Sequence, residues 1–207
     1  MWPRLRNPDL KPQAESTSTS PAELAVQFSA HERRLLLRVA HESIAAGVDS
    51  RPYTPPKTNE LLREPRGVFT TLYRDGHLRG CVGYVSAIRP LIDAVAETAQ
   101  AAAFEDTRFM PVEAPELPHL EVSLSVLSPT FAITPEEIEI GKHGLVVRQH
   151  GRKGLLLPQV APEHGWDVDA FLEQTCFKAG LPGNAWQYGA EIEAFTAEIF
   201  GDSEFHR

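Results

Sequence analysis

The chain has 207 residues, of which 42% are hydrophobic and 23% are charged, and its formal net charge is −8. This composition is typical of one globular domain or two small lobes, and it excludes a mostly disordered chain. No apolar run approaches the ~18 residues of a membrane-spanning helix, and the first 21 residues lack the apolar stretch of a secretory signal, so we expect a cytoplasmic protein.

Composition divides the chain near residue 22. Residues 1–22 contain four prolines and a run of alternating Ser and Thr, and we predict that they form a disordered tail before a folded domain at 23–207. The tail has three basic and two acidic residues, whereas the domain has 17 basic and 26 acidic residues. The acidic domain is therefore a poor electrostatic match for nucleic acid.

The folded domain opens with a predicted helix. Ser29 and Glu32 have the spacing of a capping box, and the apolar residues that follow recur at helical spacing as far as Ile44. Gly47 suits the C-terminal end of this helix. Residues 51–66 contain four prolines, and they predict a long irregular connection.

A hairpin and a second helix come next. Asp75 and Gly76 predict the turn of a hairpin whose strands lie at 67–73 and 78–84. Pro90 is typical of a first helical turn, and the apolar stripe of this helix is Leu91, Ile92, Val95, Ala96 and Ala99. A loop with several prolines should then occupy 106–118.

The second half predicts more strands than helices. In chain order we expect a strand at 120–126, a helical turn or loop at 135–138, a hairpin of 144–148 with 153–157, a helix at 168–179 and a strand at 190–200. Asp167 should cap the helix and Gly180 should end it. Because the strands pair as hairpins, we predict an α+β fold with mainly antiparallel sheet and flanking helices.

The segment Leu78-Arg79-Gly80-Cys81-Val82-Gly83 carries the strongest chemical signal. Glycine inside a strand usually marks a bulge or a close backbone approach, and a bulge can re-aim the neighbouring Cys81. Arg79 would share a face with Cys81 in an undistorted strand, and a cation near a thiol favours the reactive thiolate. The alternative is that Cys81 is a small buried thiol, packed where the glycines leave room.

These residues and several later motifs resemble the AmmeMemoRadiSam system protein A family, the Amme domain. The resemblance spans roughly 23–200, so we interpret 23–207 as an Amme-like domain. The motifs that carry it are Leu78–Gly83, Asp106–Phe109 with Pro111, Glu121–Ser128, Gly141–Leu145, Leu156–Ala161, Gly165-Trp166 and Cys176–Pro182. The resemblance implies a larger and a smaller lobe around a cleft. It also implies a Memo-like protein and a radical S-adenosylmethionine protein as partners, without implying a specific reaction.

Two further side chains are candidates for chemistry. His143 could act as a general base, or it could fix its loop through a side-chain hydrogen bond. Arg108 could bind a carboxylate or phosphate, or it could anchor a long loop through a salt bridge. Cys176 lies on the apolar stripe of its predicted helix, where a buried thiol is expected. The sequence identifies no cofactor, and no His and Cys spacing matches a standard metal site.

Two functional hypotheses follow. In the first, the chain is a cysteine-dependent enzyme or a subunit of an enzyme system, with Cys81 and His143 as its catalytic residues. Its binding residues would be Arg79, Gly80, Gly83 and Arg108, with the two arginines as the anion binders. In the second, the chain is a non-catalytic binding or adaptor module with a pocket for a small molecule or a partner. A hydrogen bond between Cys81 and His143 would favour the enzyme.

Overall fold

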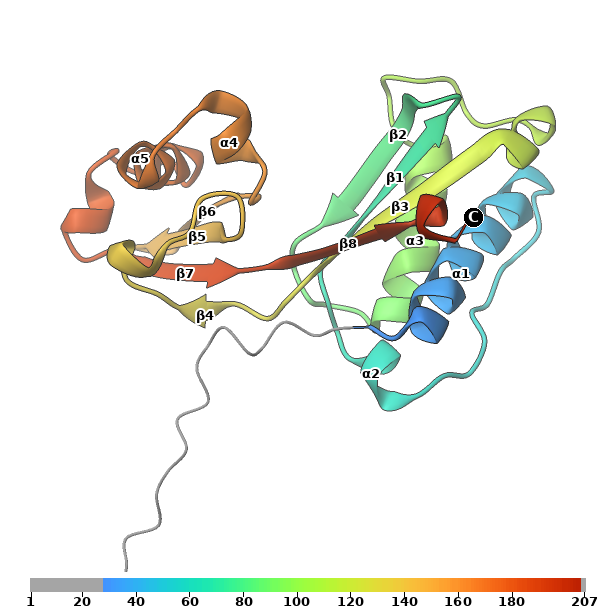
Figure 1. Ribbon diagram of the computed structural model, residues 1–207, viewed down its shortest axis with the longest axis horizontal. Coiled ribbons are helices and arrows are strands. Elements are labelled where there is room, and N and C mark those ends of the chain that lie inside the picture. Colours follow the sequence, from blue (N-terminus) through green and yellow to red (C-terminus); the bar gives the residue numbers. More distant parts are fainter. Residues whose placement is uncertain (1–27, 206–207) are drawn as a thin grey trace, which may run out of the picture.

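The computed structural model describes residues 28–205 as two lobes, each built on a four-stranded antiparallel sheet (Figure 1). The predicted tail at 1–22 lies outside the described residues. The α+β fold with antiparallel sheets and flanking helices, predicted from the paired strands, is confirmed.

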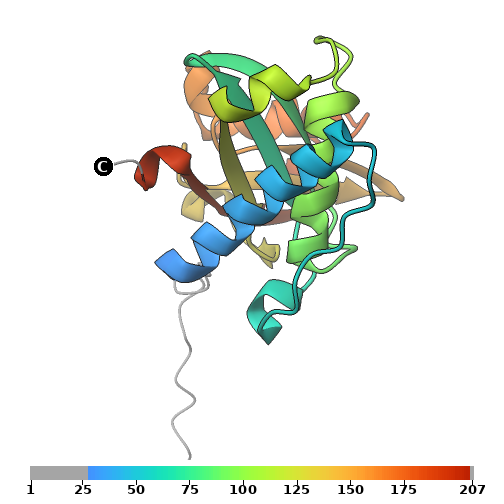
Figure 2. The ribbon, with the colours of Figure 1, turned by 90° about the vertical axis from the view of Figure 1, so that its right-hand side faces the viewer.

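The larger lobe has the strand order β2-β1-β3-β8. Two helices, α1 (Ala30–Val48) and α3 (Leu91–Phe104), cover one face of this sheet and bury their apolar stripes against it (Figure 2). Burial of these stripes is the main source of stability for this lobe. The strands are β1 (Val68–Arg74), β2 (His77–Tyr84), β3 (Leu120–Leu127) and β8 (Ala197–Gly201).

The smaller lobe has the strand order β4-β7-β5-β6. Its α5 (Val168–Lys178) packs on β5 and β6, with Phe171 and Leu172 fully buried in the local core. The short helix α4 (Val160–His164) precedes it. The strands are β4 (Phe131–Ala132), β5 (Gly144–Gln149), β6 (Arg152–Leu156) and β7 (Glu191–Phe195).

The chain crosses between the lobes twice, after β3 and after β7. The second crossing corrects the prediction of one strand at 190–200, because β7 and β8 belong to different sheets. The two crossings are bonded to each other: Ser128 N–H donates to the Thr196 carbonyl oxygen at 2.9 Å, and Thr196 N–H donates to Ser128 Oγ at 3.0 Å. An apolar cluster with Leu127 from one lobe and Val146 and Phe195 from the other joins the sheets.

Most local predictions are confirmed. Ser29 and Glu32 form the capping box, and both hairpin turns have the left-handed backbone that their sequences predict, with φ of 53° and 75° at Asp75 and Gly76. The first helix continues one residue beyond Gly47, and Pro90 lies at the N-cap instead of inside the next helix.

Three of the short helices form where the sequence predicts either a loop or no element at all. They are α2 (Glu60–Arg63), α4 and a 3₁₀ helix at Ala114–His119. Each is six residues or shorter, so it presents too little periodicity to be detected from the sequence. Among residues 28–205, no helix combines the length and the apolar character that crossing a membrane requires.

Candidate functional site

Cys81 lies on the edge strand β2, and its side chain is partly buried. It is the cross-strand partner of Thr71, whose Oγ1 lies 3.3 Å from Cys81 Sγ. Ser123 is the partner of Thr71 on the other side, so three small polar side chains form one row across the sheet. Thr70, the neighbour of Thr71, points the other way and bonds Thr98 of α3, which places Cys81 on the face that the helices leave open.

The glycines beside Cys81 have packing roles, and both structural expectations for them are met. β2 contains a bulge: Leu72 faces Gly80 and Tyr73 faces Leu78, which leaves Arg79 as the extra residue. A Cβ at Gly80 would overlap the carbonyl oxygen of Ala102 in α3. A Cβ at Gly83 would overlap the backbone of Val68 and Phe69 in β1. These positions set how closely the strand approaches its neighbours.

Asp106 connects Cys81 to Arg108. Its carboxylate accepts the Cys81 N–H at 2.9 Å, and it accepts Arg108 Nε at 2.9 Å and Nη2 at 2.7 Å. The Asp106 side chain is 7% exposed, whereas that of Arg108 is 56% exposed. Hydrogen bonds from Arg108, and then from the Cys81 backbone, hold the pKa of Asp106 far below its usual range. The buried carboxylate thus fixes an exposed cation next to the Cys81 segment.

The electrostatics link Arg108 to the thiol. The pKa of Arg108 is raised, chiefly by its hydrogen bonds to Asp106 and in smaller part by negative charge at Cys81. The salt bridge that we considered for Arg108 is present, and the Arg108 side chain remains more than half exposed.

Arg79, the extra residue of the bulge, lies near the Phe109 ring. The guanidinium carbons of Arg79 and Arg108 are 6.0 Å and 5.5 Å from the Phe109 ring centre, so both cations contact one aromatic ring. Glu116 accepts Arg79 Nε at 2.8 Å and Nη2 at 3.0 Å, which occupies most of the fork that we expected to bind an anion. The structure thus brings Arg79 and Arg108 together but gives each a carboxylate partner.

The Arg79–Glu116 pair makes a testable contribution to stability. Glu116→Gln is expected to lower the free energy of unfolding at neutral pH by about 2 kcal/mol, because partly buried Arg79 loses a charged acceptor. Hydrogen bonds from Arg79 lower the pKa of Glu116 from 4.5 to about 2. A carboxyl whose pKa is depressed by folding stabilises above its unfolded pKa, and that stabilisation is lost as the pH falls through the folded pKa. The difference between wild type and variant should therefore shrink between pH 4.5 and about 2.

Urea unfolding at several pH values measures this difference. The matched control is Glu121→Gln, which changes the same charge at an exposed position of β3. A Glu116→Gln difference that stays constant down to about pH 2 would contradict the assignment.

His143 lies in the smaller lobe, and the structure does not bring it to Cys81. Its ring is buried, Nδ1 accepts the Glu139 N–H at 3.1 Å, and Phe131 packs edge-on against it at 5.9 Å. Burial lowers the pKa of His143, which favours the neutral ring. The hydrogen bond that fixes the loop is the alternative we considered for this residue, and no bond to Cys81 occurs among residues 28–205.

The second thiol is in a different environment. Cys176 lies on α5, is fully buried, and has a pKa raised by that burial. Both cysteines are unbridged. Within the described part of the chain, no three His, Cys, Asp or Glu side chains are grouped as metal ligands.

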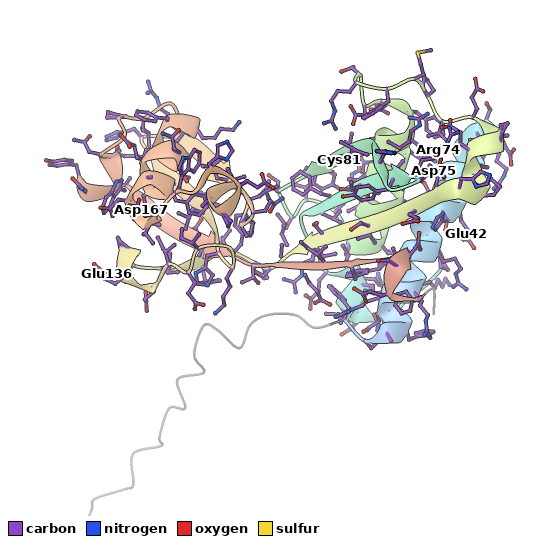
Figure 3. All side chains as sticks on the ribbon, turned by 45° about the horizontal axis from the view of Figure 1, so that its top comes forward. Glu42, Arg74, Asp75, Cys81, Glu136 and Asp167 are labelled. Atoms are coloured by element: carbon purple, nitrogen blue, oxygen red, sulfur yellow. The ribbon has the colours of Figure 1, made fainter. Side chains whose placement is uncertain are left out.

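Sequence reasoning missed three contributors to this site: Thr71, Asp106 and Glu116. The two-residue spacing of Asp106 and Arg108 was the available signal for their salt bridge. The bond from Cys81 to Asp106 joins residues 25 positions apart and depends on how the loop after α3 returns to the edge of β2. In Figure 3, Cys81 lies on the larger lobe between the turn at Arg74 and Asp75 and the smaller lobe.

Comparison with known proteins identifies relatives that span most of the chain. The AMMECR1 family profile matches residues 37–200. Protein MK0488 of Methanopyrus kandleri is 40% identical over 190 residues, which cover 86% of this chain and 92% of that protein. A protein of Thermococcus gammatolerans is 43% identical over 186 residues, covering 83% and 90% of the two chains.

A solved structure is also similar. The crystal structure of the uncharacterized protein PH0010 from Pyrococcus horikoshii matches with a TM-score of 0.66 and 40% sequence identity. The match covers 80% of this chain and 89% of that one.

Proposed function

This chain belongs to the AMMECR1 family, and from the geometry around Cys81 we propose that it is a cysteine-dependent enzyme or the thiol-bearing subunit of an enzyme system. One observation carries the proposal: buried Asp106 binds the backbone N–H of the partly exposed Cys81 and holds the exposed Arg108 guanidinium next to this segment. A fixed cation next to a thiol stabilises both the thiolate and a negatively charged substrate.

The chemistry that fits this arrangement is nucleophilic attack by the sulfur on an electrophilic carbon. The new bond joins Cys81 Sγ to that carbon, the leaving group departs with the electron pair of its own bond, and the thiol proton passes to water. Thr71 Oγ1, at 3.3 Å, can hydrogen-bond the sulfur before attack. Arg108 would hold an anionic group of the substrate, while Gly80 and Gly83 set the backbone that supports the thiol.

The charge selectivity of alkylation tests this proposal. Iodoacetate is an anion and iodoacetamide is neutral, and both react with the same thiolate. The rate with iodoacetate divided by the rate with iodoacetamide therefore reports the charge near the sulfur. We expect this ratio at Cys81 to be higher in the native protein than in the unfolded chain. Arg108→Gln should lower it by about threefold at low salt, and added salt should weaken the effect.

The matched control is Arg63→Gln, which removes an exposed arginine at the end of α2 and changes the net charge equally. Peptide mass spectrometry separates labelling of Cys81 from that of Cys176. Equal ratios in the native and unfolded protein, or equal effects of the two substitutions, would contradict a role for Arg108 at the thiol.

As a subunit, the chain would work with a Memo-like protein and a radical S-adenosylmethionine protein, the partners that the family resemblance implies. Size-exclusion chromatography of the full chain with each purified candidate tests this part of the proposal. A joint peak supports the assignment, and separate elution at concentrations above about 10 µM contradicts a stable complex.

One observation favours the second candidate, a non-catalytic binding or adaptor module. His143 is bonded to Glu139 and lies in the other lobe, so it supplies no base at Cys81 in this arrangement. A module of this kind would keep its function in a Cys81→Ala variant, whereas the cysteine-dependent enzyme would lose it. That substitution in the native system therefore distinguishes the two candidates.

A further inference from the structure

A cavity of about 370 Å³ lies where the two lobes meet. The larger lobe contributes Arg33, Arg66 and Glu198 to its wall, and the smaller lobe contributes Lys142 and Pro158. This volume lies within the range of small-molecule sites, which are mostly apolar with a few polar groups at fixed positions. Cys81 and the residues bonded to it are not part of this wall.

Arg66 is the unusual member of the wall. It precedes β1, is only 6% exposed, and donates from Nη2 to Glu64 at the surface. Its Nε and Nη1 are buried and have no hydrogen-bond partner among the described residues. Buried guanidinium donors without acceptors are unfavourable, and native structures rarely retain them. A ligand that supplies acceptors would remove this cost.

The charges around the cavity favour an anion. Glu198, the acidic residue of the wall, accepts hydrogen bonds from Arg33 and from the Phe28 N–H, so its charge is compensated locally. The other two cations of the wall are Arg66 and Lys142. Arg66 pairs with Glu64 and Lys142 pairs with Glu139, and both of these carboxylate side chains are more than half exposed. Exposed partners of this kind hold a cation weakly and can be exchanged for a ligand.

We propose that this cavity binds a small organic anion, with one carboxylate or phosphate group attached to an apolar body. Once Arg66 Nη2 releases Glu64, it donates to the oxyanion together with Nε or Nη1, in the bidentate manner that guanidinium favours. Lys142 approaches the same group from the other lobe, so the ligand bridges the lobes. Phe28, Val126 and Leu127 contact the apolar body. Other protein atoms cover Nε and Nη1 of Arg66, so binding requires this side chain to rotate and release Glu64.

Calorimetric titration of the full chain with four probes tests the proposal. Phenyl phosphate and benzoate carry the two oxyanions on an apolar ring, inorganic phosphate lacks the ring, and benzyl alcohol lacks the charge. We expect one of the two ring-bearing anions to bind with a Kd of about 100 µM, and the other two probes to bind at least tenfold more weakly. Whichever of phenyl phosphate and benzoate binds with the lower Kd identifies the preferred oxyanion.

Charge reversal at Lys142 shows whether binding occurs in this cavity. Lys142 is 44% exposed, so Lys142→Glu should fold normally, and we expect it to weaken the tighter probe at least tenfold. Lys57→Glu makes the same change in net charge at an exposed site outside the cavity wall, and it should change the affinity less than twofold. Arg66→Lys keeps the charge but loses the fork, and where it folds it should also weaken binding.

The outcomes separate this proposal from the one for Cys81. Cys81→Ala should leave the affinity unchanged, because the thiol is outside the cavity wall. The proposal is overturned if neither ring-bearing anion binds below about 10 mM. It is also overturned if Lys142→Glu and Lys57→Glu have equal effects, or if benzyl alcohol binds as tightly as the anions.

Discussion

In the native protein, iodoacetamide is expected to label Cys81 at least ~1,000 times faster than Cys176. Cys81 is partly exposed on the open face of a sheet, whereas Cys176 is fully buried in the core of the smaller lobe. Labelling of Cys176 therefore requires the smaller lobe to unfold, and burial also raises the pKa of its thiol. Time-resolved labelling followed by peptide mass spectrometry measures both rates in one sample.

The unfolded chain is the control for this comparison. In concentrated urea the two thiols should react at rates within about threefold of each other, because neither retains its native environment. Equal rates in the native protein would show that Cys81 is as protected as Cys176. The thiol would then be a packing residue, and the cysteine-dependent function would be wrong.

The second large effect is expected from Gly80→Ala, which should lower the free energy of unfolding by about 3 kcal/mol or prevent folding. The added methyl group would overlap the Ala102 carbonyl oxygen of α3. Both partners in this contact are backbone, so the strand and the helix would have to separate to relieve the overlap. Separation would disturb the buried contacts between α3 and the sheet along their whole length.

Chemical denaturation and the thermal midpoint measure this effect. Ser123→Ala is the control, because it changes one side chain on the open face of the same sheet and should alter stability by less than ~0.5 kcal/mol. A Gly80→Ala variant as stable as wild type would show that β2 and α3 are not held as closely as the structure describes.

The candidate site was only partly predictable because its residues come from distant segments of the chain. The motif around Cys81 can be recognised in the sequence because two glycines interrupt a predicted strand, which is unusual. The residues that bond to this motif cannot be recognised in the same way. Asp106 is one of many loop carboxylates in the sequence, and only the return of the loop after α3 places it on the Cys81 N–H.

The cavity between the lobes shows the same limitation more strongly. Arg66 lies in a proline-rich segment that we predicted to be irregular, where an arginine is expected to be solvated. The structure buries it because it lies two residues before β1, in the wall of the cavity where the two lobes meet. Nothing in the local sequence distinguishes it from exposed Arg63, three positions earlier.

By itself, the sequence determined the elements whose signals are local: the capped helix after Ser29, the turns at Asp75 and His150, the alternating strand at 120–126, and the α+β class that follows from paired strands. Tertiary structure alone decided which sheet each strand joins. Residues 190–200 illustrate the difference, because their extended backbone is correct but the strand divides at Thr196 between two sheets. Alternation reports that one face of a strand is buried, and it carries no information about what buries it. The same physical limit applies to the candidate site. The sequence specifies the motif at Cys81. The bond from Asp106 to Cys81, the placement of Arg108 and the cavity at Arg66 arise only when distant segments pack together.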